Sequence, residues 1–187
     1  YKLIDISILR YILNKDYKDN YTNWKNWKAK DFGLLSNIEE SYFNKELKKT
    51  QLKFSNRLNV LELGFGNGSF LTFCIKKKWD ISGIEVNENL VSLASKKGIN
   101  AKNGSLGNLF EDKSFDLIVA FDVLEHLTCI EIAEILKSMK KKLKSNGVIL
   151  ARFPNGDSPL GLKYQNGDIT HKTFIGSDMA KYFANSI

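Results

Sequence analysis

The stretch that decides the fold is Val60-Leu61-Glu62-Leu63-Gly64-Phe65-Gly66-Asn67-Gly68, in which an apolar run meets three alternating glycines. Residues 58–63 have the length and apolar character of a short buried strand, and residues 68–78 carry apolar side chains at helical spacing. Glycines permit a tight turn and let a ligand approach the backbone closely, while the start of a helix offers free amide groups. Residues 64–68, here called the glycine loop, are therefore predicted to be a ligand-binding turn between a strand and a helix.

Strands and helices continue to alternate after this turn. Further strands are predicted over 80–86, 99–103, 115–121 and 148–153, with helices over 87–97, about 132–143 and 177–186, and a turn at 145–147. Elements of this size in alternation predict a mostly parallel sheet with helices on both faces. The expected fold class is therefore α/β and Rossmann-like.

An acidic residue, Glu85, stands at the end of the second predicted strand. A carboxylate at this point can accept hydrogen bonds from both ribose hydroxyls of a nucleoside. The dinucleotide pattern Gly-x-Gly-x-x-Gly would need its third glycine at Ser69, which the sequence lacks. The tighter spacing of the glycine loop favours a nucleoside that has no pyrophosphate.

Four motifs follow one another along this pattern: residues 61–68, Glu85, residues 104–106 (Gly-Ser-Leu) and residues 121–127 (Phe-Asp-Val-Leu-Glu-His-Leu). In order and spacing, over about residues 55–187, they resemble class I methyltransferases that depend on S-adenosylmethionine (SAM). The resemblance implies SAM as methyl donor and S-adenosylhomocysteine as product. Many members carry Asp where Ser105 stands, so only a backbone contact from Leu106 is implied at the adenine. The residues that the resemblance assigns to SAM are Glu62, Gly64, Phe65, Gly66, Gly68, Glu85, Val86, Ser105, Leu106, Phe121 and Asp122.

Two later segments, 152–159 and 167–171, resemble a subgroup of bacterial methyltransferases associated with surface-polysaccharide or glycan modification. This resemblance implies a hydroxyl group of a small or glycan-type acceptor as the methylated group. Removal of the hydroxyl proton needs a base, and histidine suits that role near neutral pH. The chain has two histidines, His126 and His171, and both follow strands at the edge where open α/β sheets bind ligands. They are the candidate catalytic residues, together with Glu125.

Each histidine also has a purely structural interpretation. His126 could bond to nearby backbone at a helix start, and His171 could be held by Asp168, three positions earlier. A divalent metal ion is a further alternative. Asp122, Glu125, His126 and His171 are similar to the ligand set of small-RNA 2′-O-methyltransferases. Because metal-free relatives carry Glu-His at the same point, no metal ligand is assigned.

Residues 1–55 precede the regular pattern, and residues 56–187 form the expected SAM-binding domain. Helical spacing is visible at Ile4, Ile8, Tyr11 and Ile12, and two tryptophans, Trp24 and Trp27, follow. We expect a helical cap packed on the main domain, or a lid that closes one side of the substrate pocket. Strands six and seven of the methyltransferase sheet are missing from the pattern, which suggests an incomplete chain or an exposed sheet edge that favours a homodimer.

The net charge of +7 has a simple explanation that involves no nucleic acid. The lysines are dispersed, and runs such as 76–78, 96–97 and 140–142 fall where helices are predicted to end, where cations complement the helix dipole.

Cys74 lies in an apolar stretch and is expected to be a buried thiol. The sequence has no apolar run of membrane-spanning length and no signal peptide, so a cytoplasmic location is expected.

Two rival functions remain at this stage. One is a nucleotide- or NAD-binding enzyme of sugar metabolism, which the glycine spacing and the lack of a Tyr-x-x-x-Lys pair near the fourth or fifth strand disfavour. The other is a SAM-binding module without catalytic activity. Loss of SAM affinity on replacing Glu85 or Gly66 would exclude the first rival, and turnover would exclude the second.

Overall fold

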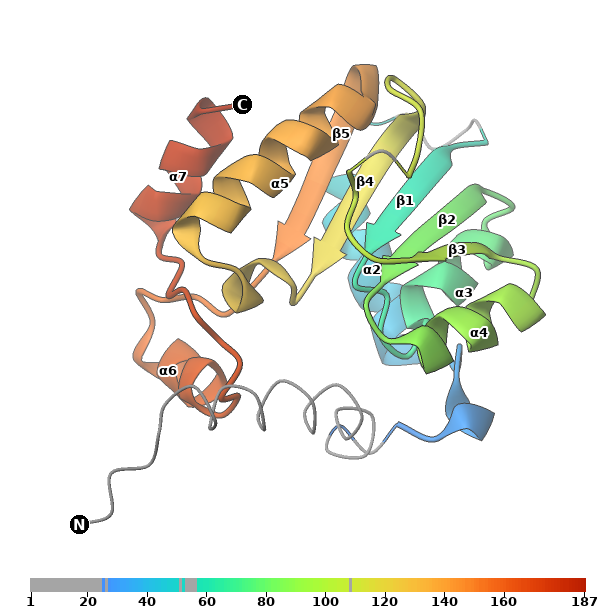
Figure 1. The fold of residues 1–187 in the computed structure, drawn as a ribbon. Coiled ribbons are helices and arrows are strands. Elements are labelled where there is room, and N and C mark those ends of the chain that lie inside the picture. Colours follow the sequence, from blue (N-terminus) through green and yellow to red (C-terminus); the bar gives the residue numbers. More distant parts are fainter. Residues whose placement is uncertain (1–24, 26, 51, 53–56, 108) are drawn as a thin grey trace, which may run out of the picture.

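The computed structural model describes residue 25, residues 27–50, residue 52, residues 57–107 and residues 109–187, and it is shown in Figure 1. Its five strands are β1 (Asn59–Leu63), β2 (Asp80–Glu85), β3 (Asn100–Asn103), β4 (Phe115–Phe121) and β5 (Leu143–Arg152). Its helices are α2 (Asn37–Lys48), α3 (Ser69–Lys76), α4 (Glu88–Lys96), α5 (Cys129–Lys142), α6 (Pro159–Asn166) and α7 (Ser177–Asn185), with short 3-10 turns η1 (Ala29–Asp31) and η2 (Leu124–His126). The strands form one sheet in the order β3-β2-β1-β4-β5, and every neighbouring pair is parallel. The predicted α/β fold with a parallel sheet is confirmed.

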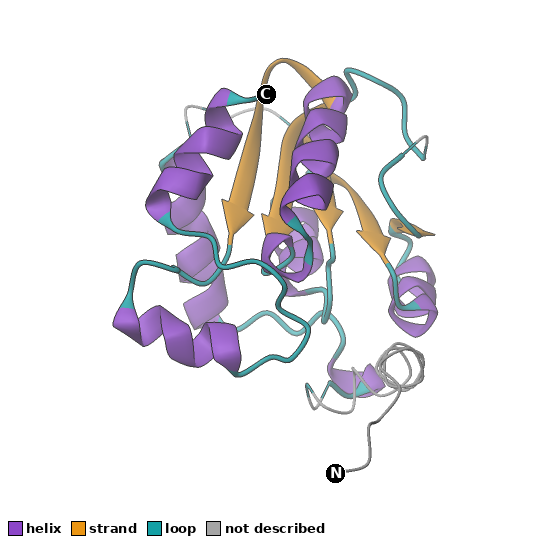
Figure 2. Cartoon of the chain, turned by 60° about the vertical axis from the view of Figure 1, so that its left-hand side comes forward, coloured by secondary structure: helices purple, strands orange, loops and turns teal. Residues whose placement is uncertain are grey.

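Side chains alternate between the two faces of the sheet along each strand. Both faces therefore present apolar side chains, and helices cover both. On one face, Leu61 belongs to a buried cluster with residues of α5 and α7, including Ile132 and Phe183. On the other face, Val60 belongs to a cluster with residues of α2 and α3, including Phe43 and Phe70. Figures 1 and 2 show α5 on the near face and α2 behind the sheet.

The carboxyl ends of all five strands meet at one edge, which we call the carboxyl edge. The glycine loop follows β1 there, η2 follows β4, and the segment containing α6 follows β5 (Figure 1). Residues that are distant in sequence are thus gathered at the edge where open α/β sheets bind their ligands.

The predicted turn at 145–147 is wrong, because these residues lie within β5. Leu143 pairs with Phe115 and the next pair joins Val148 to Leu117, so the extra residues form an irregularity inside the strand. A Cβ atom on Gly147 would lie 2.9 Å from the carbonyl oxygen of Phe115, which explains the glycine at this point.

Helix α6 is not among the predicted elements, and it lies in a segment, residues 154–167, that contains two prolines and three glycines. Pro159 stands at the first position of this helix, where its missing N–H costs no intrahelical hydrogen bond. The lysine runs lie at the ends of α3, α4 and α5 as predicted, and Cys74 is buried. The helical spacing at residues 4–12, Trp24 and the expected boundary between residues 55 and 56 lie outside the described residues.

Within the described part of the chain, none of the helices combines the length and the apolar character that a bilayer crossing requires. Strand β5 pairs with β4 alone among the described strands, so its other edge has no strand neighbour there.

Candidate functional site

The glycine loop needs its glycines for conformation and for space. Gly64, Gly66 and Gly68 have φ values of 64°, 49° and 76°, in the left-handed region that other residues rarely adopt. A Cβ atom on Gly66 would lie 2.7 Å from Cη2 of Trp27, and one on Gly64 would lie 2.6 Å from a methyl group of Val123. The loop therefore lies closely between the N-terminal segment and the residues after β4.

Glu85 is joined to the glycine loop by its carboxylate. Oε2 accepts a hydrogen bond from the backbone N–H of Gly66 at 3.1 Å, and Oε1 accepts from Val86 at 2.8 Å and Asn87 at 3.1 Å. Burial raises the pKa of Glu85, although these three amides lower it. The predicted ribose acid thus stands at the end of β2, in contact with the loop that follows β1.

Glu62 is a second buried acid beside this one. Its side chain is 3% exposed, and Oε2 has no hydrogen-bond partner among the described residues. Burial raises the pKa of Glu62 well above its usual value, and the charge of Glu85 raises it further. A buried acid with an unused oxygen is costly unless a ligand satisfies it, so the pair suits a cationic or hydroxyl-bearing ligand.

The remaining predicted SAM residues divide into exposed and buried side chains. Val86 is 62% exposed at the carboxyl edge, and Ser105 is exposed in the loop after β3. Phe65, Leu106 and Phe121 are buried in the core, so a ligand would meet their backbone rather than their side chains.

Asp122 follows β4 with a φ of 56° and is held by Arg152 at the end of β5. Nε of Arg152 donates to Oδ1 of Asp122 at 3.0 Å, and a second guanidinium nitrogen donates to Oδ2. The guanidinium group lies over the rings of Tyr42 and Phe121, at 5.2 and 5.0 Å from their centroids. Tyr42 and Arg152 are not among the site residues predicted from sequence, although Arg152 falls near the end of the predicted strand 148–153.

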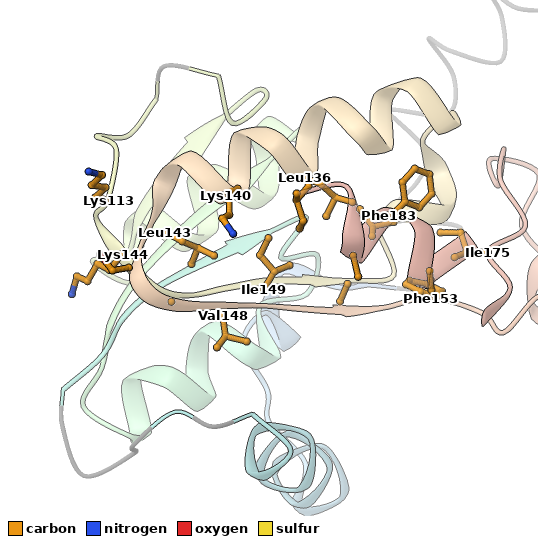
Figure 3. Close-up of a pocket in the computed structure, with 17 residues that line it drawn as sticks. Lys113, Leu136, Lys140, Leu143, Lys144, Val148, Ile149, Phe153, Ile175 and Phe183 are labelled. Carbon is orange, nitrogen blue, oxygen red and sulfur yellow. The ribbon is translucent and has the colours of Figure 1, made fainter. Parts of the chain in front are cut away.

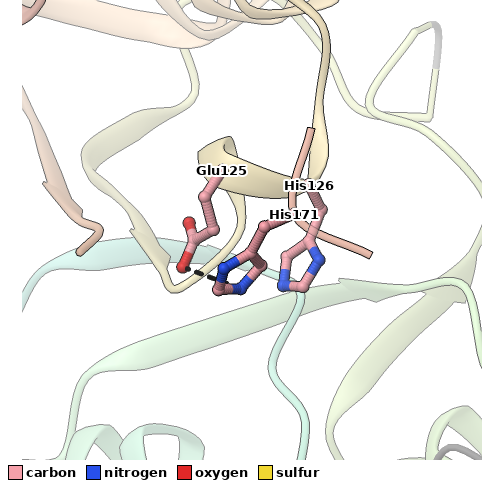
Figure 4. Close-up of side chains that lie close together, drawn as sticks. All are labelled: Glu125, His126 and His171. Carbon is pink, nitrogen blue, oxygen red and sulfur yellow. Dashed lines mark ion pairs between the residues drawn. The ribbon is translucent and has the colours of Figure 1, made fainter. Parts of the chain in front are cut away.

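The three candidate catalytic residues do lie together. Glu125 and His126 are in η2, while His171 comes from the loop after α6, and Figure 4 shows the three side chains extending in the same direction. The His126 and His171 rings are 4.7 Å apart between centroids, at an angle of 72°. Nε2 of His171 lies 4.0 Å from Oε1 of Glu125 and 3.9 Å from Oδ2 of Asp168.

Backbone hydrogen bonds hold this arrangement. The carbonyl oxygen of Glu125 accepts from the N–H groups of Lys172 and Thr173, at 2.7 and 3.1 Å. The hydroxyl of Thr173 donates to the carbonyl oxygen of Leu127 at 2.6 Å. The loop that carries His171 is therefore fastened directly to η2.

Each histidine ring has a defined partner on Nδ1. Nδ1 of His126 lies 2.8 Å from Oγ1 of Thr170, and Nδ1 of His171 lies 2.9 Å from the carbonyl oxygen of Gln165. Because a carbonyl oxygen can only accept, His171 must carry its proton on Nδ1. Sequence reasoning missed Gln165 and Thr170; only the tertiary fold brings them to the rings.

Burial sets the electrostatics of the cluster. Burial, helped by the charges of Asp122 and Asp168 and opposed by a backbone hydrogen bond and the charge of Arg152, raises the pKa of Glu125, which is 1% exposed, to about 7. Burial, and then the charge of His171, lower the pKa of His126. His126 is therefore a neutral imidazole at neutral pH.

Glu125, His126 and His171 could also hold a metal ion, because one ligand atom from each lies within 4.8 Å of the others. Asp122, the fourth member of the ligand set considered from sequence, is bonded to Arg152 instead. The structure thus groups three of those four residues.

The described part of the N-terminal segment touches both halves of the site. Trp27 lies against Gly66, and Nζ of Lys25 lies 3.3 Å from Oδ2 of Asp168. Neither contact follows from local sequence pattern.

A separate cavity of about 620 Å³ lies between α5, β5 and α7 (Figure 3). Its walls are mainly apolar and include Leu136, Ile149, Phe153, Ile175 and Phe183. None of the residues assigned to SAM or to catalysis lines it.

Comparisons with known proteins agree with this fold. The methyltransferase-domain family matches residues 34–183. The chain is 27% identical over 150 residues to an uncharacterized protein of Methanocaldococcus jannaschii, and 21% identical over 152 residues to a ubiquinone biosynthesis O-methyltransferase of Rickettsia bellii. Each match includes 77% of this chain, which spans only 63% and 62% of the length of these two relatives.

A solved structure, that of a SAM-dependent methyltransferase from Archaeoglobus fulgidus, is similar with a TM-score of 0.72 and 21% identity. The similarity covers 91% of this chain and 73% of that one. The Rossmann-like architecture predicted from the glycine loop is thus shared with a methyltransferase of known structure.

Proposed function

The chain belongs to the methyltransferase-domain family, and from this premise we propose that it transfers the methyl group of SAM to a hydroxyl group of a small or glycan-type acceptor. The observation that carries the SAM assignment is the contact between Glu85 and Gly66. It places a buried carboxylate against a glycine turn at the carboxyl edge, where a ribose can be bound from both sides.

The chemistry of the surrounding groups fits SAM. Its ribose hydroxyls would donate to Glu85, whose oxygens retain lone pairs beside the three amides they already accept. Its ammonium and sulfonium charges suit a site that contains the buried acid Glu62. The exposed apolar side chain of Val86, near Ser105 and the backbone of Leu106, offers a surface for the adenine.

The histidine cluster supports methyl transfer to an oxygen atom. The acceptor oxygen attacks the methyl carbon, the carbon–sulfur bond breaks with its electron pair on sulfur, and S-adenosylhomocysteine leaves. The hydroxyl proton passes to Nε2 of His126, which is neutral because burial lowers its pKa. His171 and Glu125 lie beside this ring. The charge of Asp168, which raises the pKa of His126, stabilises the positive charge that the ring acquires.

The acceptor class rests on weaker support. The ubiquinone biosynthesis O-methyltransferase among the relatives is consistent with a hydroxyl acceptor. The segments that resemble the glycan-associated subgroup fold into the loops around α6, and one of them carries His171. The contacts of Lys25 and Trp27 with the site support a role for residues 1–55 as a cap or lid over the main domain, residues 56–187.

Calorimetry with SAM, followed by measurement of S-adenosylhomocysteine release with glycans, nucleotide sugars, quinone precursors and RNA, tests this proposal. We expect SAM binding that Glu85→Ala weakens, and turnover with a hydroxylated acceptor. Binding of NAD in place of SAM would favour the sugar-metabolism alternative. SAM binding without turnover on any acceptor would leave a non-catalytic module.

A further inference from the structure

One hydroxyl group joins His126 to a buried carboxylate. Oγ1 of Thr170 lies 2.5 Å from Oδ1 of Asp168 and 2.8 Å from Nδ1 of His126. Asp168 is 6% exposed, and its Oδ1 also accepts the backbone N–H of Thr170 at 3.0 Å. Burial alone would raise the pKa of Asp168, but the hydrogen bonds from Thr170 and the charge of Lys25 lower it.

The direction of these hydrogen bonds follows from proton counting. A charged carboxylate has no proton to donate, so the single hydroxyl proton of Thr170 must point to Asp168. The oxygen of Thr170 then offers a lone pair to His126, whose Nδ1 must carry the proton. Nε2 of His126 is left with a free lone pair, which is the state that a general base needs.

We propose that Thr170 is a positioning residue, which transmits the charge of Asp168 to His126 and fixes the Nδ1–H tautomer. This inference rests on the proposed methyl transfer for its catalytic meaning, since Thr170 acts through His126 and need not touch the acceptor. The chain Asp168–Thr170–His126 is called the relay below.

The relay is also fastened to the N-terminal segment. Lys25 lies 3.3 Å from Oδ2 of Asp168, on the oxygen that Thr170 does not use. Two positions further along, Trp27 lies against Gly66 of the glycine loop. Lys25 and Trp27 thus contact the anchor of the relay and the glycine loop, respectively.

The tautomer can be measured without turnover by long-range ¹H–¹⁵N spectra of the histidine rings at about pH 8, above the ordinary histidine pKa. The chain has only two histidines, so His171→Gln assigns the signals. We expect His126 to be protonated on Nδ1 in the native protein. Thr170→Val should shift it toward the Nε2–H form, and Thr170→Ser, which restores a hydroxyl, should return it.

A matched control is Thr50→Val, because the hydroxyl of Thr50 also bonds to a neighbouring group, the carbonyl oxygen of Leu47, but in a distant helix end. It should leave both the His126 signals and turnover unchanged. In the activity assay, Thr170→Val should lower kcat about 10- to 100-fold with unchanged SAM affinity, and Thr170→Ser should stay within about threefold of the native rate.

Two outcomes would contradict the proposed role of the relay. One is a native His126 protonated on Nε2, and the other is a Thr170→Val variant with native tautomer and native kcat. Failure of the proposed function gives a different result, namely no S-adenosylhomocysteine from the native protein with any acceptor. In that case the tautomer spectra still decide whether Thr170 sets the state of His126.

Discussion

Oε2 of Glu85 accepts a hydrogen bond from the backbone N–H of Gly66 at 3.1 Å. This contact ties the end of β2 to the turn that follows β1, and the parallel pairing of these strands makes it geometrically natural. A second bond, from the N–H of Gly64 to the carbonyl oxygen of Ile84 at 2.8 Å, continues the strand pairing into the glycine loop. Two hydrogen bonds therefore join the glycine loop to the end of β2.

Replacement of Glu85 by alanine should weaken SAM binding about 100-fold. The variant loses a charged acceptor for two ribose hydroxyls, and hydrogen bonds to charged groups contribute about 1.5 to 3 kcal/mol each. Calorimetric titration with SAM measures the effect. Glu88→Ala is the matched control, because Glu88 is an exposed acid three positions away. Equal losses in the two variants would contradict the role of Glu85.

Gly66→Ala and Gly98→Ala separate backbone strain from crowding. Both glycines have positive φ, at 49° and 76°, so each alanine should cost about 1 to 2 kcal/mol of unfolding free energy. A Cβ atom at Gly98 meets nothing within 4 Å, whereas one at Gly66 meets Trp27. Only Gly66→Ala should therefore also weaken SAM binding, by about tenfold. Urea unfolding and calorimetry measure the two effects, and a native SAM affinity for Gly66→Ala would contradict the placement of the cofactor.

Local pattern was sufficient for the fold class and for the edge of the sheet at which the candidate site lies. Glu85 could be placed at that edge because a strand end, a glycine turn and their order in the chain are visible in the sequence. His126 and His171 could be placed at the same edge for that reason as well. The short distance between the two rings depends on the hydrogen bonds of Lys172 and Thr173 to Glu125. Hydrophobic periodicity in the sequence does not predict these bonds.

The partners of the candidate site residues could not be predicted. Thr170 and Gln165 bond to rings that are 44 and 6 positions away, and Arg152 reaches Asp122 across 30 positions. The contacts of Thr170 and Gln165 arise from loop conformation and packing, whereas Arg152 reaches Asp122 where β5 pairs with β4. Helix α6, in a segment with prolines and glycines, is also absent from the predicted elements.

Glu125 should make the folded state less stable as the pH rises. Its pKa is raised from 4.5 to about 7, so between these values the folded protein holds a proton that the unfolded chain has lost. This stabilising contribution is fully present below pH 4.5 and is lost as the pH rises through about 7, and the loss amounts to about 3 kcal/mol. Glu125→Gln, which cannot ionise, should therefore be more stable than the native protein at about pH 8 and similar to it at pH 5, as measured by urea unfolding.

Glu131 provides a control of opposite sign. Hydrogen bonds from the backbone and side chain of Thr128 lower its pKa, so its contribution is present above the usual glutamate pKa and is lost as the pH falls. Glu131→Gln should therefore lose stability at pH 8 rather than gain it. Glu125→Gln behaving in the same way as Glu131→Gln would show that Glu125 is charged and well solvated in the folded protein.

The rate of methyl transfer should follow the neutral form of His126. Burial and the charge of His171 lower its pKa from 6.5, so the rate should rise with pH through a value below 6.5 and be level at neutral pH. His126→Gln should lower kcat about 100-fold and abolish this rise, while SAM affinity stays native. A variant with native kcat, or a rise centred above pH 7, would remove His126 from the role of base.

Removal of divalent metal ions should leave methyl transfer intact, because a neutral His126 can take the acceptor proton directly. Glu125, His126 and His171 nevertheless offer ligand atoms within 4.8 Å of one another, so the metal alternative has a defined location. Rates before and after exhaustive treatment with EDTA, with the metal content of the protein measured in parallel, distinguish the two mechanisms. If activity is lost on treatment and returns with Mn²⁺ or Zn²⁺, the three residues are metal ligands. The ion would then lower the pKa of the acceptor hydroxyl. Unchanged activity in metal-free protein, together with the pH profile of His126, supports proton transfer to the imidazole.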